Sequence, residues 1–549
     1  MWGAALLVTA ACVAALLRLL DGAVAAAALS AVALAAALPL LLLPRDPSER
    51  ACALAAGAAA GWVVGVALAL PAPAGWFFPD VAWHTAKAAV AAAGHPFDDP
   101  ILRGPTLYPF LFGAVVGAPV ALGLSASTAM WLASPVSLAG AFWAHRQLAG
   151  TTLGPLATAW SALALPAFLY FPTRSYALLP TPFNFSLFFV FAGLALAVRA
   201  LEQDDRRRLA LAGLTLGTAG LLWYAHLPWI AAWAAWLALR RRAAPLLVGA
   251  APCALLLLLH LAVLASAGLL GDSGVTTAPV EGGWLRWLGV VGRNSLTLSG
   301  GRSLADVPFW MGPLLLGLLA VSWLRRPPGR PWMQPALAVA CIALGVVAVL
   351  LGQRLTYGEF FLWRYTFVLY ALLLVTAAGA RPLALAGRRL PAAAVAALAA
   401  ALFAPGWLVA RYESSVADEA RFDATVAEVQ RFLQESTRFD EPVFAPFSVW
   451  EGAIGCCAPR PNLVDRQGGL YKYASAALVG ERWHDYRELR RTGNAEAIAE
   501  RLRPYGFRFA VLRSSAQAPG FAALAAGFEV VLRNDEYVVV DLRRPVEAP

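Results

Sequence analysis

Continuous apolar runs dominate the first 410 residues of the chain, and short charged segments separate them. Most of these runs contain 17–25 residues, and a helix needs about 20 apolar residues to cross the hydrocarbon core of a bilayer. The runs are continuous and do not alternate with polar positions, which excludes a transmembrane β-barrel. The pattern therefore predicts a polytopic α-helical membrane protein.

One short apolar run is interrupted by prolines and glycines. Residues 107–123 contain Pro109 and Pro119, and we interpret them as a juxtamembrane or re-entrant helix. The remaining runs predict about 13 membrane spans, near residues 2–20, 22–43, 51–70, 124–144, 152–171, 183–199, 208–223, 227–240, 244–268, 309–324, 333–352, 362–379 and 390–408.

The basic turns between these spans set the expected topology. Arginines fall in predicted turns at 145–147, 204–208, 240–242, 325–330 and 381–389. All of these turns lie on one side of the membrane when 107–123 does not cross it, and the positive-inside rule makes that side cytoplasmic. We therefore expect a cytoplasmic N-terminus and an external C-terminus.

The pattern changes beyond Arg411, where charged residues become frequent and the long apolar runs stop. Residues 419–436 have the spacing of an amphipathic helix. Strand-like segments follow at 441–447, 507–512, 528–533 and 537–542, and Asn534-Asp535 is expected to join the last two as a hairpin. The predicted organisation is a membrane domain over 1–410, with external loops at 71–107 and 269–308, and an extracytoplasmic α/β domain over 411–549.

Composition supports the membrane assignment and excludes one class of partner. Of 549 residues, 60% are hydrophobic and 14% are charged, whereas a soluble domain carries about 25% charged residues. The net charge of +10 comes from arginines that flank the apolar runs, so it indicates topology and not nucleic-acid binding. Abundant arginine and alanine suggest a GC-rich bacterial genome, and we expect a multi-pass protein of the bacterial cytoplasmic membrane.

Ionisable residues gather between Gly75 and Pro109. This stretch holds three carboxylates and two histidines, namely Asp80, Asp98, Asp99, His84 and His95. An ionisable side chain at mid-bilayer costs about 2.5–3.5 kcal/mol on insertion scales, so the cluster belongs at an interface or in a cavity. Residues 80–93 are predicted to form a helix with Asp80 as its N-cap, which would put Asp80 and His84 on one face.

Several segments taken together resemble the GT-C superfamily of membrane glycosyltransferases, which use polyprenyl-phosphate-linked sugars. Asp80 follows an early span in FFPDVAWH, and Tyr108-Pro109 in PTLYPFLFG is followed by the small-residue turn GLSAS. The segments AHRQLAG and YFPTRSYALLP then end two spans, and GLTLGTAGLLWYAHLPWIAAW forms a short helical hairpin. The resemblance covers roughly residues 51–245, and within the superfamily the chain resembles the protein mannosyltransferase, aminoarabinose transferase and arabinofuranosyltransferase-like group. Protein O-mannosyltransferase-like members carry an Asp-Glu pair in this loop, but here Val81 follows Asp80.

The resemblance implies a hexosyl- or pentosyltransferase. Such an enzyme moves a sugar from a polyprenyl-phosphate donor to a glycan, lipid or protein acceptor. The donor's lipid lies among the membrane lipids, and transfer takes place at the external face of the membrane. The resemblance implies that Asp80 is the general base. The alternative is that Asp80 only caps its helix. His84 either orients the acceptor or carries protons, and the alternative is a histidine that is hydrogen-bonded to Asp80 for structure.

The negative charge of the donor phosphate is expected to bind cationic side chains at the external ends of the spans. Arg174, Arg354 and Arg364 occupy such positions, and a guanidinium offers bidentate hydrogen bonds to phosphate. Interfacial anchoring by snorkelling is the alternative for each arginine. His226, at the hairpin tip, is either a substrate contact or a packed polar residue, and the motif places Tyr108 among the substrate-binding residues.

No cofactor is firmly implied. Asp98 and Asp99 are candidates to bind a divalent cation with Asp80, as in some oligosaccharyltransferase relatives, and a solvated turn is the alternative. Two other functions remain open: a transporter or flippase of lipid-linked glycan, and a non-catalytic scaffold with an external binding domain. A transporter predicts charged residues deep within spans and an internal repeat.

Overall fold

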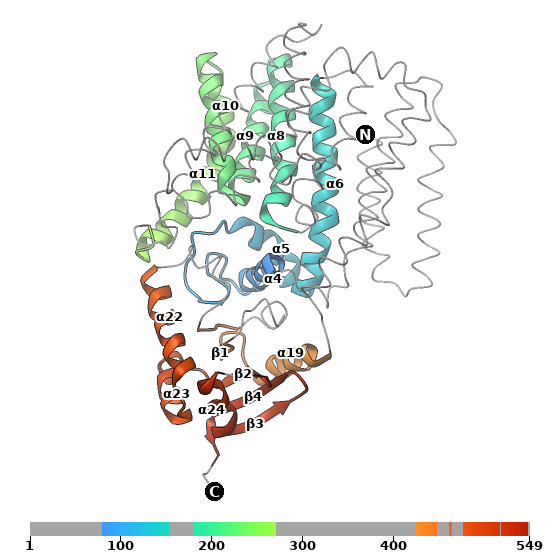
Figure 1. Ribbon diagram of the computed structural model, residues 1–549. Coiled ribbons are helices and arrows are strands. Elements are labelled where there is room, and N and C mark those ends of the chain that lie inside the picture. Colours follow the sequence, from blue (N-terminus) through green and yellow to red (C-terminus); the bar gives the residue numbers. More distant parts are fainter. Residues whose placement is uncertain are drawn as a thin grey trace, which may run out of the picture. The chain divides into compact units, whose positions relative to one another are not determined.

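A computed structural model describes residues 79–152, 180–270, 424–446, 460–463, 476–515 and 518–546 (Figure 1). The chain divides into two compact units. The first comprises Met1–Leu70, Leu132–Leu257 and Thr277–Glu413, and the second comprises Pro71–Trp131, Leu258–Thr276 and Ser414–Pro549. Many predicted spans lie outside the described residues, so the number of 13 stays a prediction.

The described part of the first unit is helical. Its elements are α6 (Ala126–Thr152), α8 (Pro182–Gln203), α9 (Arg206–Leu222), the 3₁₀ turn η3 (Tyr224–His226), α10 (Leu227–Leu239) and α11 (Ala243–Ser266), of which α6 and α11 run on into the second unit. The spans predicted at 183–199, 208–223, 227–240 and 244–268 coincide with α8 to α11. Within the described residues, α8 and α11 are the two helices long and apolar enough to cross a membrane.

Capping residues define both ends of α8 and the start of α9. Thr181 precedes α8 and its hydroxyl accepts a hydrogen bond from the Asn184 N–H at 3.4 Å. Asp204 ends the helix with a φ of 52°. Asp205 then caps α9, since its carboxylate accepts the N–H groups of Arg207 and Arg208 at 3.0 and 3.1 Å. Two adjacent aspartates therefore stop one helix and start the next.

Glycines let α9 and α11 approach each other closely. A Cβ added to Gly213 would collide with the backbone of Leu246, and one added to Gly249 would collide with the backbone of Ala210. Small residues at helix contacts are typical of membrane helices, where close backbone approach gives good packing. These glycines therefore fit a membrane-embedded helix pair.

The basic turn predicted at 145–147 is wrong. Helix α6 continues to Thr152, eight residues beyond the predicted end of the span. Two contacts to α8 explain the continuation: the Gln147 side-chain oxygen accepts Arg199 Nη2 at 2.7 Å, and the buried His145 ring lies 5.3 Å from the Phe191 ring. Packing against α8 holds these polar residues in the helix.

Two short helices open the second unit. Helix α4 spans Pro79–Ala92 and α5 spans Leu111–Ala121, the run expected not to cross the membrane. With 11 residues, α5 is about 16 Å long, and the hydrocarbon core is about 30 Å thick. A Cβ at Gly117 would lie 2.7 Å from the Ala88 carbonyl oxygen, so glycine is required where α5 meets α4.

The C-terminal part of the second unit is an α/β fold. A four-stranded sheet has the order β1-β2-β4-β3, with β1 (Val443–Phe444), β2 (Phe509–Arg513), β3 (Phe528–Arg533) and β4 (Tyr537–Pro545). Only β1 and β2 are parallel; the other pairs are antiparallel. The helical elements are α19 (Ala424–Ser436), α22 (Ala476–Arg491), α23 (Ala495–Leu502), η5 (Arg503–Tyr505) and α24 (Pro519–Gly527).

The four predicted strands and the hairpin are present in this sheet. The Asn534 side-chain oxygen accepts the N–H groups of Glu536 and Tyr537 at 3.2 and 2.8 Å, which fixes the turn between β3 and β4. Strand β1 is shorter than the predicted 441–447. Buried apolar side chains of the strands and helices form one core, which includes Phe444, Ile498, Phe521, Leu524 and Val540.

Candidate active site

Helix α4 carries two of the predicted site residues. It begins at Pro79, so Asp80 is the second helical residue and not the N-cap that we predicted. Proline suits the first helical position because its missing N–H would have no partner there. Asp80 and His84 are four residues apart in α4, which is about one helical turn.

The structure brings His84 and Tyr108 together. His84 Nε2 lies 3.4 Å from the Tyr108 hydroxyl, and the ring centroids are 5.5 Å apart. Both side chains are buried. The hydroxyl lies at the long end of hydrogen-bonding distance, so the pair is a weak hydrogen bond that a change in protonation could strengthen.

Aromatic rings enclose this pair. The Trp83 ring is 4.7 Å from the Tyr108 ring and 5.2 Å from the His84 ring, both edge to face. The Phe112 ring, on α5, lies edge to face with the His84 ring, with 5.5 Å between the centroids. The imidazole is therefore held in a fixed orientation between α4, α5 and the loop that joins them.

Lys87 is a buried cation that we did not predict as a site residue. Its side chain is only 1% exposed, and Nζ donates a hydrogen bond to the Asp98 carbonyl oxygen. Burial lowers the pKa of Lys87 to about 8, although the nearby Asp99 and Asp98 carboxylates oppose this change. The rarity of lysine was a signal, because Lys87 and Lys472 are the only lysines in the chain.

The carboxylates of Asp98 and Asp99 already have partners. Asp99 Oδ1 accepts the N–H groups of Ile101 and Leu102, both at 2.8 Å, and Asp98 Oδ2 lies 3.2 Å from His95 Nδ1. Burial raises the pKa of Asp99. The described residues contain no group of three potential metal ligands. Asp98 and Asp99 thus stabilise their own loop, and the cation site considered above, which also needs the Asp80 side chain, stays a prediction.

His226 lies in the first unit, at the hairpin tip as predicted. Its side chain is 2% exposed, and Nε2 lies 2.8 Å from the Ser186 hydroxyl. Ser186 donates its proton to the Phe183 carbonyl oxygen at 2.6 Å, so we assign the His226 proton to Nε2. These contacts favour the packed-residue interpretation. Arg174, Arg354 and Arg364 lie outside the described residues.

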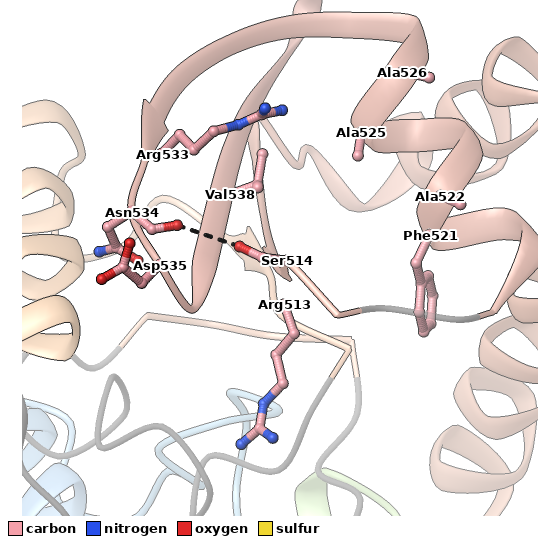
Figure 2. A pocket seen from close by; sticks show the side chains of 10 residues that line it. All are labelled: Arg513, Ser514, Phe521, Ala522, Ala525, Ala526, Arg533, Asn534, Asp535 and Val538. Carbon is pink, nitrogen blue, oxygen red and sulfur yellow. Dashed lines mark hydrogen bonds between the residues drawn. The ribbon is translucent and has the colours of Figure 1, made fainter.

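The C-terminal α/β part contains a pocket of about 530 Å³ (Figure 2). The wall on α24 is apolar and includes Phe521, Ala522 and Ala525, and polar groups come from the ends of β2 and β3 and from the turn to β4. Figure 2 shows Arg533 extending toward α24, with Asn534 and Asp535 on the opposite side. An apolar wall with charged groups around it suits a polar ring compound such as a sugar.

Comparisons with known proteins give the fold class. No protein-family model matches the chain, and no curated protein matches it by sequence. Among solved structures, ArnT from Cupriavidus metallidurans bound to undecaprenyl phosphate is similar with a TM-score of 0.57 and 15% identity, over 89% of this chain and 97% of that chain. The apo form of that protein gives a TM-score of 0.56 and 14% identity, over 88% of this chain and 96% of that chain.

A second solved structure is more distant. The apo oligosaccharyltransferase of Archaeoglobus fulgidus has a TM-score of 0.50 and 12% identity, over 84% of this chain and 69% of that chain. Together these structures show the fold: the chain has a GT-C-like fold, similar to that of ArnT and of the oligosaccharyltransferase. Within that class, the similarity to ArnT extends over nearly the full length of both chains. The expected GT-C fold is confirmed.

Proposed function

We propose that this protein is a glycosyltransferase that moves a sugar from a polyprenyl-phosphate-linked donor to a glycan, lipid or protein acceptor. We place the reaction at the external face of the bacterial cytoplasmic membrane. One observation carries the proposal: the fold matches ArnT over 97% of that chain, and the matched structure holds undecaprenyl phosphate. The distribution of ionisable residues in the first external loop supports the same reaction.

Asp80 is the general base in this proposal. Its carboxylate takes the proton of the acceptor hydroxyl while the acceptor oxygen attacks the anomeric carbon of the donor. The bond from that carbon to the phosphate oxygen breaks, and its electron pair leaves on the polyprenyl phosphate. Arg174, Arg354 and Arg364 are the candidates to stabilise the charge on that phosphate.

The His84–Tyr108 pair supplies the second proton-handling group. His84 is one helical turn from Asp80 and 3.4 Å from the Tyr108 hydroxyl. An imidazole in this position can pass a proton onward after Asp80 receives it, with the phenol fixing the ring orientation. Lys87 lies one turn further along α4 and secures the loop through the Asp98 carbonyl oxygen.

The C-terminal pocket is our candidate for contacts to the acceptor. A guanidinium, a carboxylate and an apolar wall can together bind the hydroxyl groups and the carbon face of a sugar. Arg533 and Asp535 would contact an acceptor glycan that carries an anionic group. The sugar ring would pack against Ala522 and Ala525 of α24.

A donor assay on the purified full-length protein in detergent tests the reaction. Polyprenyl-phosphate sugars are supplied with candidate acceptors, and release of free polyprenyl phosphate is followed for the wild type and for Asp80→Asn. We expect release by the wild type and a loss of about 10²–10⁴-fold in the variant, which is the usual contribution of a general base. Asp440→Asn is the control, because this carboxylate is 69% exposed and pairs with Arg438 at 3.0 Å.

The other outcomes assign different functions. Equal release by wild type and Asp80→Asn would remove Asp80 from the chemistry. If the wild type releases nothing with any donor but moves the lipid-linked sugar across a vesicle bilayer, the protein is a transporter. Neither release nor transport would favour the scaffold.

A further inference from the structure

Arg103 has an unusual backbone conformation in the loop between α4 and α5. Its φ is +53°, and the φ of the next residue, Gly104, is +105°. A left-handed conformation is unfavourable for a residue with a long side chain, and glycine is the usual choice there. The turn is closed by two backbone hydrogen bonds, from Asp99 N to Gly104 O at 2.7 Å and from Arg103 N to Asp99 O at 3.2 Å. Strain of this kind often marks a position with a specific task.

The Arg103 side chain reaches a residue that is distant in the sequence. Arg103 Nη2 donates a hydrogen bond to the Phe439 carbonyl oxygen at 3.1 Å, and the guanidinium carbon lies 4.7 Å from the Phe439 ring centroid. Both contacts are to the same residue, one to its backbone and one to its ring. Phe439 follows α19 in the C-terminal part of the second unit. Arg103 thus combines a charged hydrogen bond with a cation–π contact.

The C-terminal part holds Phe439 firmly. Arg460 lies near the same ring, with its guanidinium carbon 5.9 Å from the centroid. Arg460 also donates to Thr437, from Nε to the hydroxyl oxygen at 2.8 Å and from Nη2 to the carbonyl oxygen at 3.1 Å. The segment before Phe439 is therefore tied to the segment that begins at residue 460.

A second bond joins the same loop to the C-terminal part. The Asn462 N–H donates to the Ile101 carbonyl oxygen at 3.0 Å. The Asn462 side chain is fixed in turn by Ala445, because it accepts the Ala445 N–H at 3.1 Å and donates to the Ala445 carbonyl oxygen at 2.8 Å. Ile101 and Leu102 are buried in the assembled unit. The loop is docked at two separate points.

The loop is also fastened to the candidate active site. Lys87 of α4 donates to the Asp98 carbonyl oxygen, and His260 Nε2 lies 2.9 Å from the Thr106 carbonyl oxygen. The Thr106 hydroxyl accepts the Tyr108 N–H at 3.3 Å. A shift of the loop would therefore move Tyr108 relative to His84.

We propose that Arg103 and Phe439 form a latch, through which the C-terminal domain holds the loop at 93–106 and so sets the position of the His84–Tyr108 pair. Arg103 is a positioning residue in this role, because it acts on the pair through the loop. Through the latch, the C-terminal domain contributes to the geometry of the candidate active site. The kinetic consequence rests on the proposed function, but the structural consequence does not.

Hydrogen–deuterium exchange on the full-length protein in detergent tests the latch without any substrate. The variants are Arg103→Asn, which keeps a residue tolerant of the left-handed backbone, and Phe439→Leu, which removes only the ring. We expect each to raise exchange in peptides covering 93–110 by about tenfold, since local opening governs exchange. The double variant should add little to either single one, because both remove the same contact.

Arg438→Ala is the matched control. Arg438 is the neighbour of Phe439, its side chain is 82% exposed, and it pairs with Asp440 at 3.0 Å. We expect this change to leave exchange at 93–110 unaltered. Unchanged exchange in both Arg103→Asn and Phe439→Leu would overturn the latch. A rise spread evenly over the C-terminal domain in both variants would also overturn it, since that would indicate general destabilisation.

The transfer assay gives the second readout. A positioning role predicts that Arg103→Asn lowers kcat about tenfold and leaves the donor KM unchanged, because loop geometry affects the reaction step more than donor binding. Arg103→Lys should recover part of kcat, since the ammonium keeps the charge but loses the planar fork. A raised donor KM with unchanged kcat would show that Arg103 binds the donor and would overturn the positioning role. A wild type without activity would refute the proposed function alone, because exchange would still report on the latch.

Discussion

Lys87 is a basic residue in a buried environment, where a charge is unfavourable. It is buried between α4, α5 and the loop at 98–104, and Gly113 leaves room for its side chain. The ammonium is retained because the Asp98 carbonyl oxygen accepts its hydrogen bond and Asp99 lies nearby. A buried cation that is partly compensated has two properties: it holds its neighbours in place, and its charge depends on pH.

We predict that Lys87 makes the stability of the protein depend on pH in the alkaline range. Its pKa is about 8 in the folded protein and 10.5 in an unperturbed chain. Between these values the unfolded state binds more protons, so the free energy of unfolding rises with pH. The difference between the two pKa values corresponds to about 3 kcal/mol.

Thermal unfolding in detergent from pH 7.5 to about 10.5 measures this effect. Relative to Lys87→Met, the wild type should become more stable as the pH rises through this window. Lys472→Met is the control, because it removes the only other lysine of the chain. A constant difference between wild type and Lys87→Met across the range would contradict the prediction.

Among the elements, helices α4 and α5 hold the His84–Tyr108 pair in place because they pack against each other. They are joined by a loop, and their contact sets the distance between His84 and Tyr108. The tyrosine contributes two separable things, a ring that packs on Trp83 at 4.7 Å and a hydroxyl near the imidazole. A substitution that keeps the ring can therefore separate packing from proton handling.

Tyr108→Phe should lower sugar transfer without unfolding the site. The ring contacts remain, so the midpoint of thermal unfolding should change little. Loss of the hydroxyl removes its weak hydrogen bond to the imidazole, and we expect kcat to fall about tenfold, at the low end of acid–base effects. Steady-state transfer assays check this result, with His84→Gln as the companion variant. If Tyr108→Phe is fully active, the pair has a packing role only.

How well the sequence predicts an element depends on the range of the forces that shape it. Helices α8 to α11 were predicted within a few residues because apolar runs and the aspartates of the 204–205 turn define them locally. The end of α6 was predicted wrongly. In the sequence His145 and Gln147 have the pattern of a polar turn, and only their contacts with α8 explain why they are helical. The Arg103–Phe439 contact joins positions 336 residues apart, and no local pattern announces such a contact.

At the scale of the whole molecule, the second compact unit collects three distant segments of the chain. Residues 79–110 and the end of α11 belong with the C-terminal sheet in one unit, whereas the predicted organisation divides the chain at residue 411. The position of residue 411 lies outside the described part of the chain, so that boundary stays a prediction. The unit nevertheless groups the candidate base, the His84–Tyr108 pair and the C-terminal pocket. Under the proposed function, substitutions within this one unit would therefore test the transfer step and acceptor binding separately.

Arg533→Ala tests that separation. Arg533 lines the C-terminal pocket and extends toward α24 (Figure 2), and the described residues offer its guanidinium no ion-pair partner. If the pocket binds an anionic acceptor, losing this charge should raise the acceptor KM about tenfold, since a charge-assisted hydrogen bond contributes roughly 1.5–3 kcal/mol. The donor KM should stay constant, because the donor phosphate is bound elsewhere.

Arg543→Ala is the control for Arg533, because Arg543 lies on β4 and does not line the pocket. Measuring both KM values for wild type and the two variants, with one anionic and one neutral acceptor, decides the role of the pocket. An effect of Arg533→Ala confined to the anionic acceptor would assign the pocket to the acceptor charge. An unchanged acceptor KM would leave the C-terminal domain with the latch as its contribution to catalysis, and the acceptor would then be recognised by the membrane domain.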